Sequence, residues 1–195
     1  MKGTIDVGTE FRTLMRGVAS TVVVVTSYVG GRPWGTTISG FMSVSVEPPL
    51  CLVSLFRHNA ICNAILERGH FGVSVLSSDL TDVARLASMP GKPKYIDSVC
   101  SERSLEKNVG EWNSDFVSGI GGSGGDGSPW SGRDPEIYGA LAHIDCDVHS
   151  VTPVADHALI IGRVREVTSL SDEPDPLLYM AGRYRQIGET LEGDR

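Results

Sequence analysis

The run STVVVVTSYV at residues 20–29 most constrains the fold, because its centre is apolar at every position. β-Branched side chains favour extended backbone, and a strand without polar alternation is buried on both of its faces. The residues GGRP at 30–33 follow as a hairpin-turn signal, so the next strand returns beside the first. The sequence therefore predicts a central strand within a buried antiparallel sheet.

Further strand patterns recur along the chain and are separated by turn residues. Residues 35–46 form one expected strand, which ends at Glu47-Pro48-Pro49 because proline cannot donate to a β-ladder. The last two strands are expected to join at a turn formed by Thr152-Pro153. The remaining expected strands are residues 50–55, 71–76, 140–148 and 157–170.

Helical patterns are short and few. Residues 9–18 show the spacing of an amphipathic helix, Asn59 can cap a helix that ends at Gly69, and Asp79 can cap one that ends near Pro90-Gly91. The order of elements lacks the alternation of strands and helices that a parallel sheet requires. We therefore expect a mainly β fold, an antiparallel barrel with flanking helices.

Length and composition limit the possible classes of protein. A chain of 195 residues with 41% hydrophobic content can build one core, so we expect a single domain over residues 1–195, with a Gly-rich loop insertion at 118–132. The net charge of −7 argues against nucleic-acid binding, which depends on a broad basic surface. The absence of a long apolar run or secretion signal, and four widely spaced cysteines, predict a reduced cytoplasmic protein without membrane association.

Two motifs in the loop at 118–132 match nucleotide-binding and nucleophile patterns by composition alone. The segment from Gly119 to Gly124 fits G-x-G-x-x-G, and the segment from Gly121 to Gly125 fits G-x-S-x-G. Neither stands between a strand and a helix, which both chemistries require, so both are interpreted as parts of a flexible insertion. The five histidines show no metal-ligand spacing, and no metal site is expected.

The strand at 35–46 carries an unusual row of hydroxyl groups. Thr37, Ser39, Ser43 and Ser45 occupy alternate positions, and apolar residues occupy most of the others. Such a face either meets solvent or lets a flat heteroaromatic ring approach the backbone, whose N–H groups and hydroxyls match the polar rim of the ring. On the pattern alone the solvent-facing interpretation is slightly favoured. The next strand leads through Arg57 to a helix N-terminus at Asn59, an arrangement that suits a phosphate.

The order of several segments resembles the flavin reductases of two-component monooxygenases. The matching segments are F-R-x-x-M from Phe11, the VVVVT run, G-T-T-x-S-x-F-x-S-V-S-x-E-P-P-L from Gly35, F-G-V-S-V-L from Phe71, G-A-L-A-H-I-D-C-D-V from Gly139, A-D-H-A-L-I-I-G-R-V from Ala155, and P-L-L-Y-x-x-G-x-Y from Pro176. Each segment is weak by itself, whereas the ordered set is specific and extends over nearly the whole chain.

The resemblance implies an FMN-binding type of split barrel, usually a homodimer. It also implies an NAD(P)H:flavin oxidoreductase, in which NADH or NADPH reduces FMN or FAD and the reduced flavin diffuses to a partner monooxygenase. Two alternatives stay open. One is an enzyme of the same fold that retains FMN and acts directly on a small organic substrate, and the other is a flavin-binding protein without turnover.

The resemblance further implies which residues bind the flavin. The strand after Gly35 holds the isoalloxazine edge and the ribityl chain, the strand after Leu50 supplies a second segment, and the following helix start lies beside the phosphate. This chain lacks the usual Ser or Thr near the phosphate, so Arg57 and Asn59 are expected to contribute more there. The flavin-binding residues expected are Thr36, Thr37, Ser39, Ser54, Leu55, Phe56, Arg57, Asn59, Ala60 and Ile61.

Other matched positions are expected to serve the hydride donor. His157 is the expected catalytic residue, as a polar contact at the nicotinamide or flavin edge, although a solvated histidine at a strand start is the alternative interpretation. Asp156 precedes it in the family's G-D-H segment, whose glycine is Ala155 here. Lys94 is expected near the phosphate or the tail of the nucleotide. The segment expected against the nicotinamide nucleotide contributes Tyr179, Gly182 and Tyr184.

Overall fold

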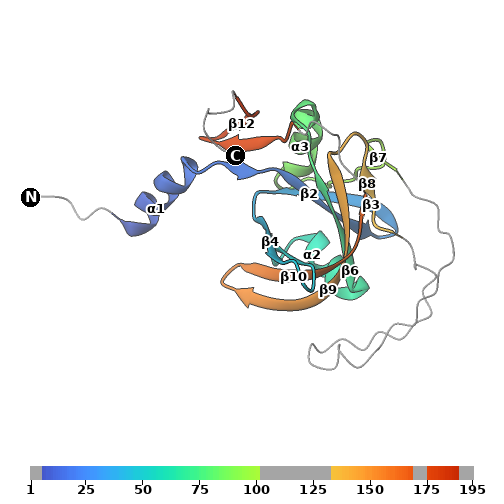
Figure 1. Cartoon of the computed structure of the whole chain (residues 1–195). Coiled ribbons are helices and arrows are strands. Elements are labelled where there is room, and N and C mark those ends of the chain that lie inside the picture. The colour runs from blue at the N-terminus through green and yellow to red at the C-terminus, as the bar shows by residue number, and fades with distance from the viewer. Residues whose placement is uncertain (1–5, 102–132, 169–174, 189–195) are drawn as a thin grey trace, which may run out of the picture.

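The computed structural model describes residues 6–101, 133–168 and 175–188. The Gly-rich loop predicted at 118–132 lies outside these residues. Figure 1 shows a curled antiparallel sheet with helices packed around it, so the prediction of a mainly β fold with flanking helices is confirmed. No helix among the described residues has the length and apolar character needed to cross a membrane.

One sheet of seven strands forms the barrel, in the order β3-β2-β6-β9-β10-β5-β4. Smaller sheets join β1, β11 and β12, and pair β7 with β8. The strands of the barrel are β2 (Val23–Val29), β3 (Arg32–Ile38), β4 (Phe41–Ser45), β5 (Leu50–Phe56), β6 (His70–Val75), β9 (Ala142–Val154) and β10 (His157–Thr168). The remaining elements are α1 (Val7–Arg16), β1 (Ser20–Thr21), α2 (Ala60–Arg68), the 3-10 helix η1 (Ser78–Leu80), α3 (Thr81–Ser88), β7 (Cys100–Ser101), β8 (Glu136–Ile137), β11 (Leu178–Met180) and β12 (Arg183–Arg185).

Strand β2 is buried on both faces, as its apolar run predicted. Val23 and Val25 face the barrel interior, where they pack with Phe71 and Ile160, and Val24 faces a second cluster that includes Ala84 and Ala87 of α3. Helix α2 contributes Ile61 and Ile65 to the first cluster. The interior is tightly packed at Gly162, where an added Cβ would approach the Phe71 ring to 2.6 Å. The two clusters therefore hold α2 and α3 against the sheet.

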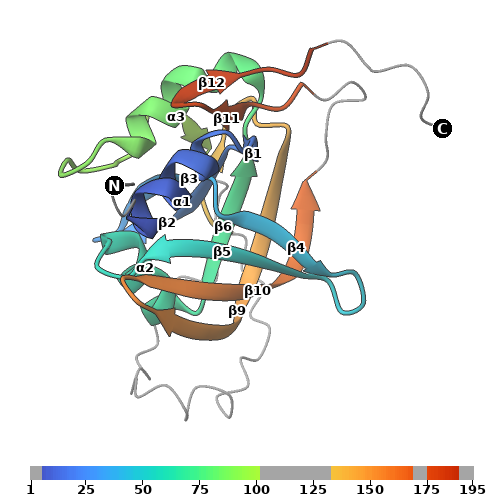
Figure 2. The ribbon, with the colours of Figure 1, turned by 90° about the vertical axis from the view of Figure 1, so that its left-hand side faces the viewer.

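The expected strand at 35–46 is two strands rather than one. β3 ends at Ile38 and β4 begins at Phe41, and these two strands form opposite edges of the seven-stranded sheet. The chain therefore crosses directly from one edge of the curled sheet to the other through Ser39-Gly40 (Figure 2). The opening that this segment spans, between the two edges of the sheet, is the split of the barrel.

The expected turn at Thr152-Pro153 was placed too early. β9 continues to Val154, Pro153 pairs with Ala158, and the reversal occurs at Ala155, which has a φ of 50°. Beyond Asp147 the paired neighbour of β9 is β10, since β6 pairs only with residues 142–147. A proline is tolerated there because its missing N–H faces a side of the strand without a ladder.

Of the two caps predicted for helices, one occupies its expected position and the other does not. Asn59 occupies the N-cap position of α2 but makes no side-chain capping bond, and Asp79 lies in the 3-10 turn before α3. The predicted end of α2 at Gly69 is confirmed, with a left-handed φ of 74°. Because the Asn59 side chain does not cap the helix, its amide group is available to contact β3.

Candidate functional site

A pocket of about 440 Å³ lies at the split, between the end of β3 and the end of β5. Residues from the strands β3, β5 and β10, the crossing segment, the N-cap of α2 and the segment after α3 surround it. Nine of the residues predicted for the site line this pocket, together with Ile38 and Gly40. The lining residues are Thr36, Thr37, Ile38, Ser39, Gly40, Ser54, Leu55, Phe56, Asn59, Lys94 and His157.

The free edge of β3 offers backbone donors to this pocket. The Gly35 N–H donates to the Lys94 carbonyl at 3.0 Å, on the side of β3 that faces away from β2. Because N–H groups two residues apart in a strand point the same way, the Thr37 N–H faces this free edge as well. The Thr37 amide is therefore positioned to bind a polar edge of a ligand.

The opposite wall of the split, formed by β5, also offers a backbone donor to the pocket. Ser54 N–H donates to the Gly40 carbonyl at 2.8 Å, and this is the last bond between β5 and the segment leading into β4. The Phe56 N–H points to the same side by alternation, beyond the end of that ladder. The split thus places backbone donors of two strands on either side of one pocket.

The hydroxyl groups of β3 are less available than the sequence predicted. The Thr37 hydroxyl, expected to face a ligand, donates to the Ala84 carbonyl of α3 at 2.8 Å. Thr36 points to the other face of β3, where it is 5% exposed and its Oγ1 accepts a bond from the Asn59 side chain at 3.4 Å. Alternation along the strand separates the two hydroxyls. What remains at the pocket is the backbone of β3 and Ser39 of the crossing segment that follows it.

The N-terminus of α2 adjoins this pocket at Asn59 and leaves two further amides without a partner in the helix. Ala60 and Ile61 are the first two residues of the helix, and the next amide, that of Cys62, already donates to the Asn59 carbonyl at 3.0 Å. The first N–H groups of a helix have no partner within it and attract anions. The Ile61 side chain is fully buried in the core, so this residue can contribute only its backbone.

His157 begins β10 directly beside the end of β5, where it pairs with Phe56. Its Nδ1 lies 2.7 Å from the Asp156 carboxylate, and its ring meets the Phe56 ring edge to face with centroids 6.0 Å apart. This hydrogen bond lowers the pKa of Asp156, because it favours the charged carboxylate. Asp156 does not line the pocket, and its contact fixes the orientation of the imidazole.

Lys94 and Arg57 are the two cations that the sequence predicted for this site. Burial lowers the pKa of Lys94, because its ammonium group has lost part of its hydration, and no bond from that group to another described residue offsets the loss. Arg57 does not line the pocket, and its guanidinium lies 3.4 Å from the Ala155 carbonyl. An anion beside Lys94 would restore the stabilisation that burial removes.

A second pocket, of about 590 Å³, contains three more of the predicted residues, whereas Arg57, Ala60, Ile61 and Asp156 line neither pocket. Tyr179, Gly182 and Tyr184 line it, away from the first pocket and beside α3. Sequence reasoning missed the other lining residues, because Thr81, Arg85 and Ser88 belong to α3 and only the fold brings them to the β11–β12 turn. Arg183, adjacent to Gly182 in the chain, was overlooked although it lies inside the matched segment.

The first pocket can bind a flat ligand that has a polar edge and an anionic tail. Amides along one side, Leu55 and Phe56 on another, and the start of α2 with Lys94 provide these three contacts. Among the described residues, no group of three His, Cys, Asp or Glu side chains could hold a metal ion. The arrangement also offers no activated nucleophile, so it suits chemistry carried by the bound ligands themselves.

Comparisons with known proteins agree with this geometry. A relative from Streptomyces coelicolor, named actinorhodin polyketide dimerase, is 32% identical over 90% of this chain and 84% of its own length. A flavin reductase (NADH) from Kitasatospora aureofaciens is 30% identical over 93% of this chain and 82% of its own. The styrene monooxygenase flavin reductase from Pseudomonas putida S12 superposes with a TM-score of 0.71 at 25% identity, over 93% of this chain and 99% of that one.

The family model described as the flavin reductase like domain matches residues 15–188, which include both pockets and every barrel strand. The predicted resemblance is therefore confirmed, and the chain belongs to the flavin reductase like family.

Proposed function

We propose that this protein is an NAD(P)H:flavin oxidoreductase that passes a hydride from a reduced nicotinamide to FMN or FAD. The observation that carries the proposal is the split of the barrel, where unpaired amides of β3 and β5 flank a pocket that also contains Lys94. The family assignment and the NADH-dependent reductase among its relatives support it. Flavin bound here supplies the redox chemistry by accepting the hydride.

The residues of this chain have binding and orienting roles in that reaction. The Thr37 and Phe56 amides meet the polar edge of the ring, where negative charge increases on reduction, and fixed dipoles stabilise such charge. The Ala60 and Ile61 amides, Lys94 and Arg57 receive the phosphate. His157, held by Asp156, contacts the nicotinamide or the flavin edge. Hydride transfer needs only close, aligned rings, so the chain need not supply a strong acid.

We further propose that the reduced flavin leaves for a separate monooxygenase by diffusion. The flavin pocket is lined mainly by backbone and small polar groups of an open split, which suits exchange rather than permanent retention. The four cysteines are free, as in proteins of a reducing compartment, and a cytoplasmic location fits them. The relative named as part of a styrene monooxygenase system supports this role.

A second candidate function rests on the Streptomyces coelicolor relative. That protein is named for dimerising a polyketide, and it is as similar to this chain as the named reductase is. The candidate is an enzyme that keeps its flavin and acts directly on an organic substrate. The two candidates differ in whether free flavin turns over.

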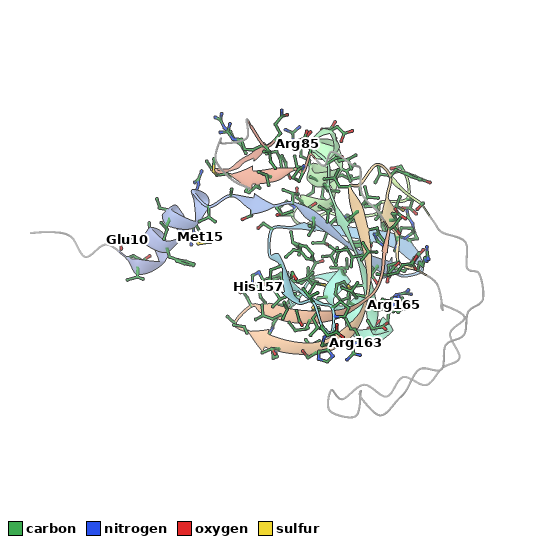
Figure 3. All side chains as sticks on the ribbon, in the orientation of Figure 1. Glu10, Met15, Arg85, His157, Arg163 and Arg165 are labelled. Atoms are coloured by element: carbon green, nitrogen blue, oxygen red, sulfur yellow. The ribbon has the colours of Figure 1, made fainter. Side chains whose placement is uncertain are left out.

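We also propose a homodimer. Helix α1 buries none of its residues, and its apolar side chains Phe11, Leu14 and Met15 stand exposed on an arm that projects from the barrel (Figures 1 and 3). Met42 and Val44 of the edge strand β4 are also exposed. Exposed apolar faces of this kind mark an interface, and a second copy would cover both.

Stopped-flow mixing with excess FMN or FAD and NADH tests the function. We expect the visible absorption of free flavin to be lost over many turnovers per protein molecule, because reduced flavin leaves and is replaced. Reduction limited to one flavin per chain would favour the second candidate. No reduction with NADH or NADPH would leave a flavin-binding protein without turnover and contradict the proposal.

Replacing Lys94 by Met tests the phosphate contact. The variant should bind FMN about tenfold more weakly, since it loses one charge-assisted hydrogen bond, while riboflavin, which lacks the phosphate, should bind as before. Fluorescence titration of both flavins measures the difference. Lys92, an exposed lysine two residues away, provides the matched control as Lys92→Met. Equal losses for FMN and riboflavin would place Lys94 at the ring instead.

Replacing His157 by Ala tests its place at the junction of the two rings. We expect the KM for NADH to rise or the hydride-transfer rate to fall by about tenfold or more, because a positioned polar contact is lost, with a smaller change in flavin affinity. Single-turnover reduction measured with the loaded protein separates the two effects. Kinetics identical to the parent would reduce His157 to a surface residue of β10.

Charge placed on the apolar face of α1 tests the dimer. Leu14→Asp should convert a dimer to a monomer, because a buried unpaired carboxylate is costly, whereas Thr13→Asp adds the same charge beside that face and should not. Light scattering coupled to gel filtration gives the mass of each variant. A parent protein that is monomeric at micromolar concentration would refute the proposal.

A further inference from the structure

Residues 94–97 pair with the outer edge of β3 and bring Lys94 to the first pocket. We call these residues the edge segment. Tyr95 forms an isolated antiparallel bridge with Trp34. Two backbone hydrogen bonds flank this bridge, from the Ile96 N–H to the Pro33 carbonyl at 3.1 Å and from the Gly35 N–H to the Lys94 carbonyl at 3.0 Å. Lys94 itself lines the pocket, so this pairing determines where the lysine lies.

The register of the pairing places Arg32 directly opposite Asp97. Trp34 faces Tyr95, and Arg32 and Asp97 each lie two positions away from that bridge, on the same side of the paired strands. The Arg32 Nε and Nη2 donate to the two carboxylate oxygens of Asp97 at 3.3 and 3.0 Å, so the contact is bidentate. This hydrogen bonding lowers the pKa of Asp97, because it favours the charged carboxylate. The pair therefore fastens the far end of the edge segment to β3.

Arg32 makes a second contact with the edge segment through Tyr95. Its guanidinium lies 3.8 Å from the centroid of the Tyr95 ring, and the Trp34 ring meets Tyr95 at 80° with centroids 5.0 Å apart. A planar guanidinium can stack on a ring and bind a carboxylate at the same time. We call Arg32, Tyr95 and Asp97 the Arg32 cluster. One arginine of β3 thus holds both Tyr95 and Asp97 of the edge segment.

Solvent limits what this cluster contributes to the stability of the whole fold. The side chains of Arg32 and Asp97 are 55% and 41% exposed, and a single exposed ion pair contributes little to the free energy of unfolding. The bidentate geometry and the ring contact make this pair stronger than an ordinary surface pair. Its effect falls on one short segment, so we expect it in the position of that segment rather than in global stability.

Lys94 depends on this anchorage because the chain before it is exposed. Residues 89–93, between α3 and the edge segment, are exposed, and Gly91 among them has a left-handed φ of 67°. After Lys94, Ile96 is fully buried in the second core cluster. The backbone of Lys94 is therefore held from the side of Ile96 and the Arg32 cluster. Burial has removed hydration from the Lys94 ammonium and lowers its pKa, so this group gains from an anion at the right distance.

From these contacts we propose that Arg32, Tyr95 and Asp97 are positioning residues, which hold Lys94 where it meets the phosphate of the flavin. The proposal rests on the proposed function, which places that phosphate beside Lys94. None of the three lines the first pocket, so they act through the backbone of the edge segment. The affinity for phosphorylated flavin depends on the Arg32 cluster, and the affinity for the ring with its ribityl chain does not.

Fluorescence titration of Asp97→Ala with FMN and riboflavin tests the proposal. The variant should bind FMN about fivefold more weakly and riboflavin as before, because the edge segment loses its bidentate contact. The direction of the change is diagnostic. Removing a negative charge would strengthen the binding of an anion if the overall field alone mattered, so weaker binding indicates a displaced lysine. Asp97→Glu keeps the carboxylate and should restore most of the FMN affinity.

The matched control is Asp147→Ala. Asp147 of β9 pairs with Arg165 at 3.3 Å, with side chains 36% and 40% exposed, and both residues lie outside the two pockets (Figure 3 labels Arg165). This variant removes the same charge from a similar ion pair, and its ratio of FMN to riboflavin affinity should equal that of the parent protein. Hydrogen exchange followed by mass spectrometry should show faster exchange in the peptide that contains Ile96 for Asp97→Ala, and not for Asp147→Ala.

Three results would overturn the proposal: FMN affinity in Asp97→Ala that equals or exceeds that of the parent, equal losses for FMN and riboflavin, or unchanged exchange at Ile96. Lys94→Met distinguishes this failure from that of the proposed function. If Lys94→Met weakens FMN binding and Asp97→Ala does not, the phosphate contact stands and the positioning role is refuted. If neither variant weakens FMN binding, both are refuted.

Discussion

The structure depends on where the β-ladder stops at the split of the barrel. β3 and β4 follow one another in the chain yet form opposite edges of one sheet, so two residues must cross the opening between them. Pairing resumes only at the bond from Ser54 N–H to the Gly40 carbonyl. An amide left without a ladder partner must find another partner or remain in water. The unpaired donors beside the first pocket are those left by this crossing.

Gly40 makes the crossing possible at such close range. An added Cβ at this position would approach the Ser54 Cβ to 2.9 Å, closer than two such atoms can lie, so a larger residue would force the strands apart. The residues beside this glycine in the sequence do not reveal the contact, because Ser54 lies on a different strand. A substitution there would alter the width of the pocket together with the packing of β5.

The sequence predicted the elements better than it predicted which way their side chains point. The run at 20–29 was assigned to one strand buried on both faces. This is confirmed for residues 23–27 of β2, whereas Ser20 and Thr21 form β1 of a different sheet. The hydroxyl row at 35–46 was treated as one face of one strand, which fails once the chain leaves the sheet at Ser39 and resumes at Phe41. Where a strand is interrupted, the alternation of its residues no longer indicates which of them share a face.

The full lining of the second pocket could not be predicted from sequence patterns. Its wall combines α3 with the β11–β12 turn, which are separated by about half of the chain and are brought together by the second core cluster around Val24 and Ala87 and by the contact of Arg85 with the Tyr184 ring. Arg85 belongs to the exposed face of an amphipathic helix, where an arginine is unremarkable by pattern. Its importance arises from neighbours that the fold supplies.

Helix α3 gives the two pockets a physical connection. Its inner face is fixed by Ala84 and Ala87, both fully buried, and the Thr37 hydroxyl ties the same turn of the helix to β3. Because one helix lines the second pocket and is tied to the strand that lines the first, the spacing between the two pockets is set by α3 itself.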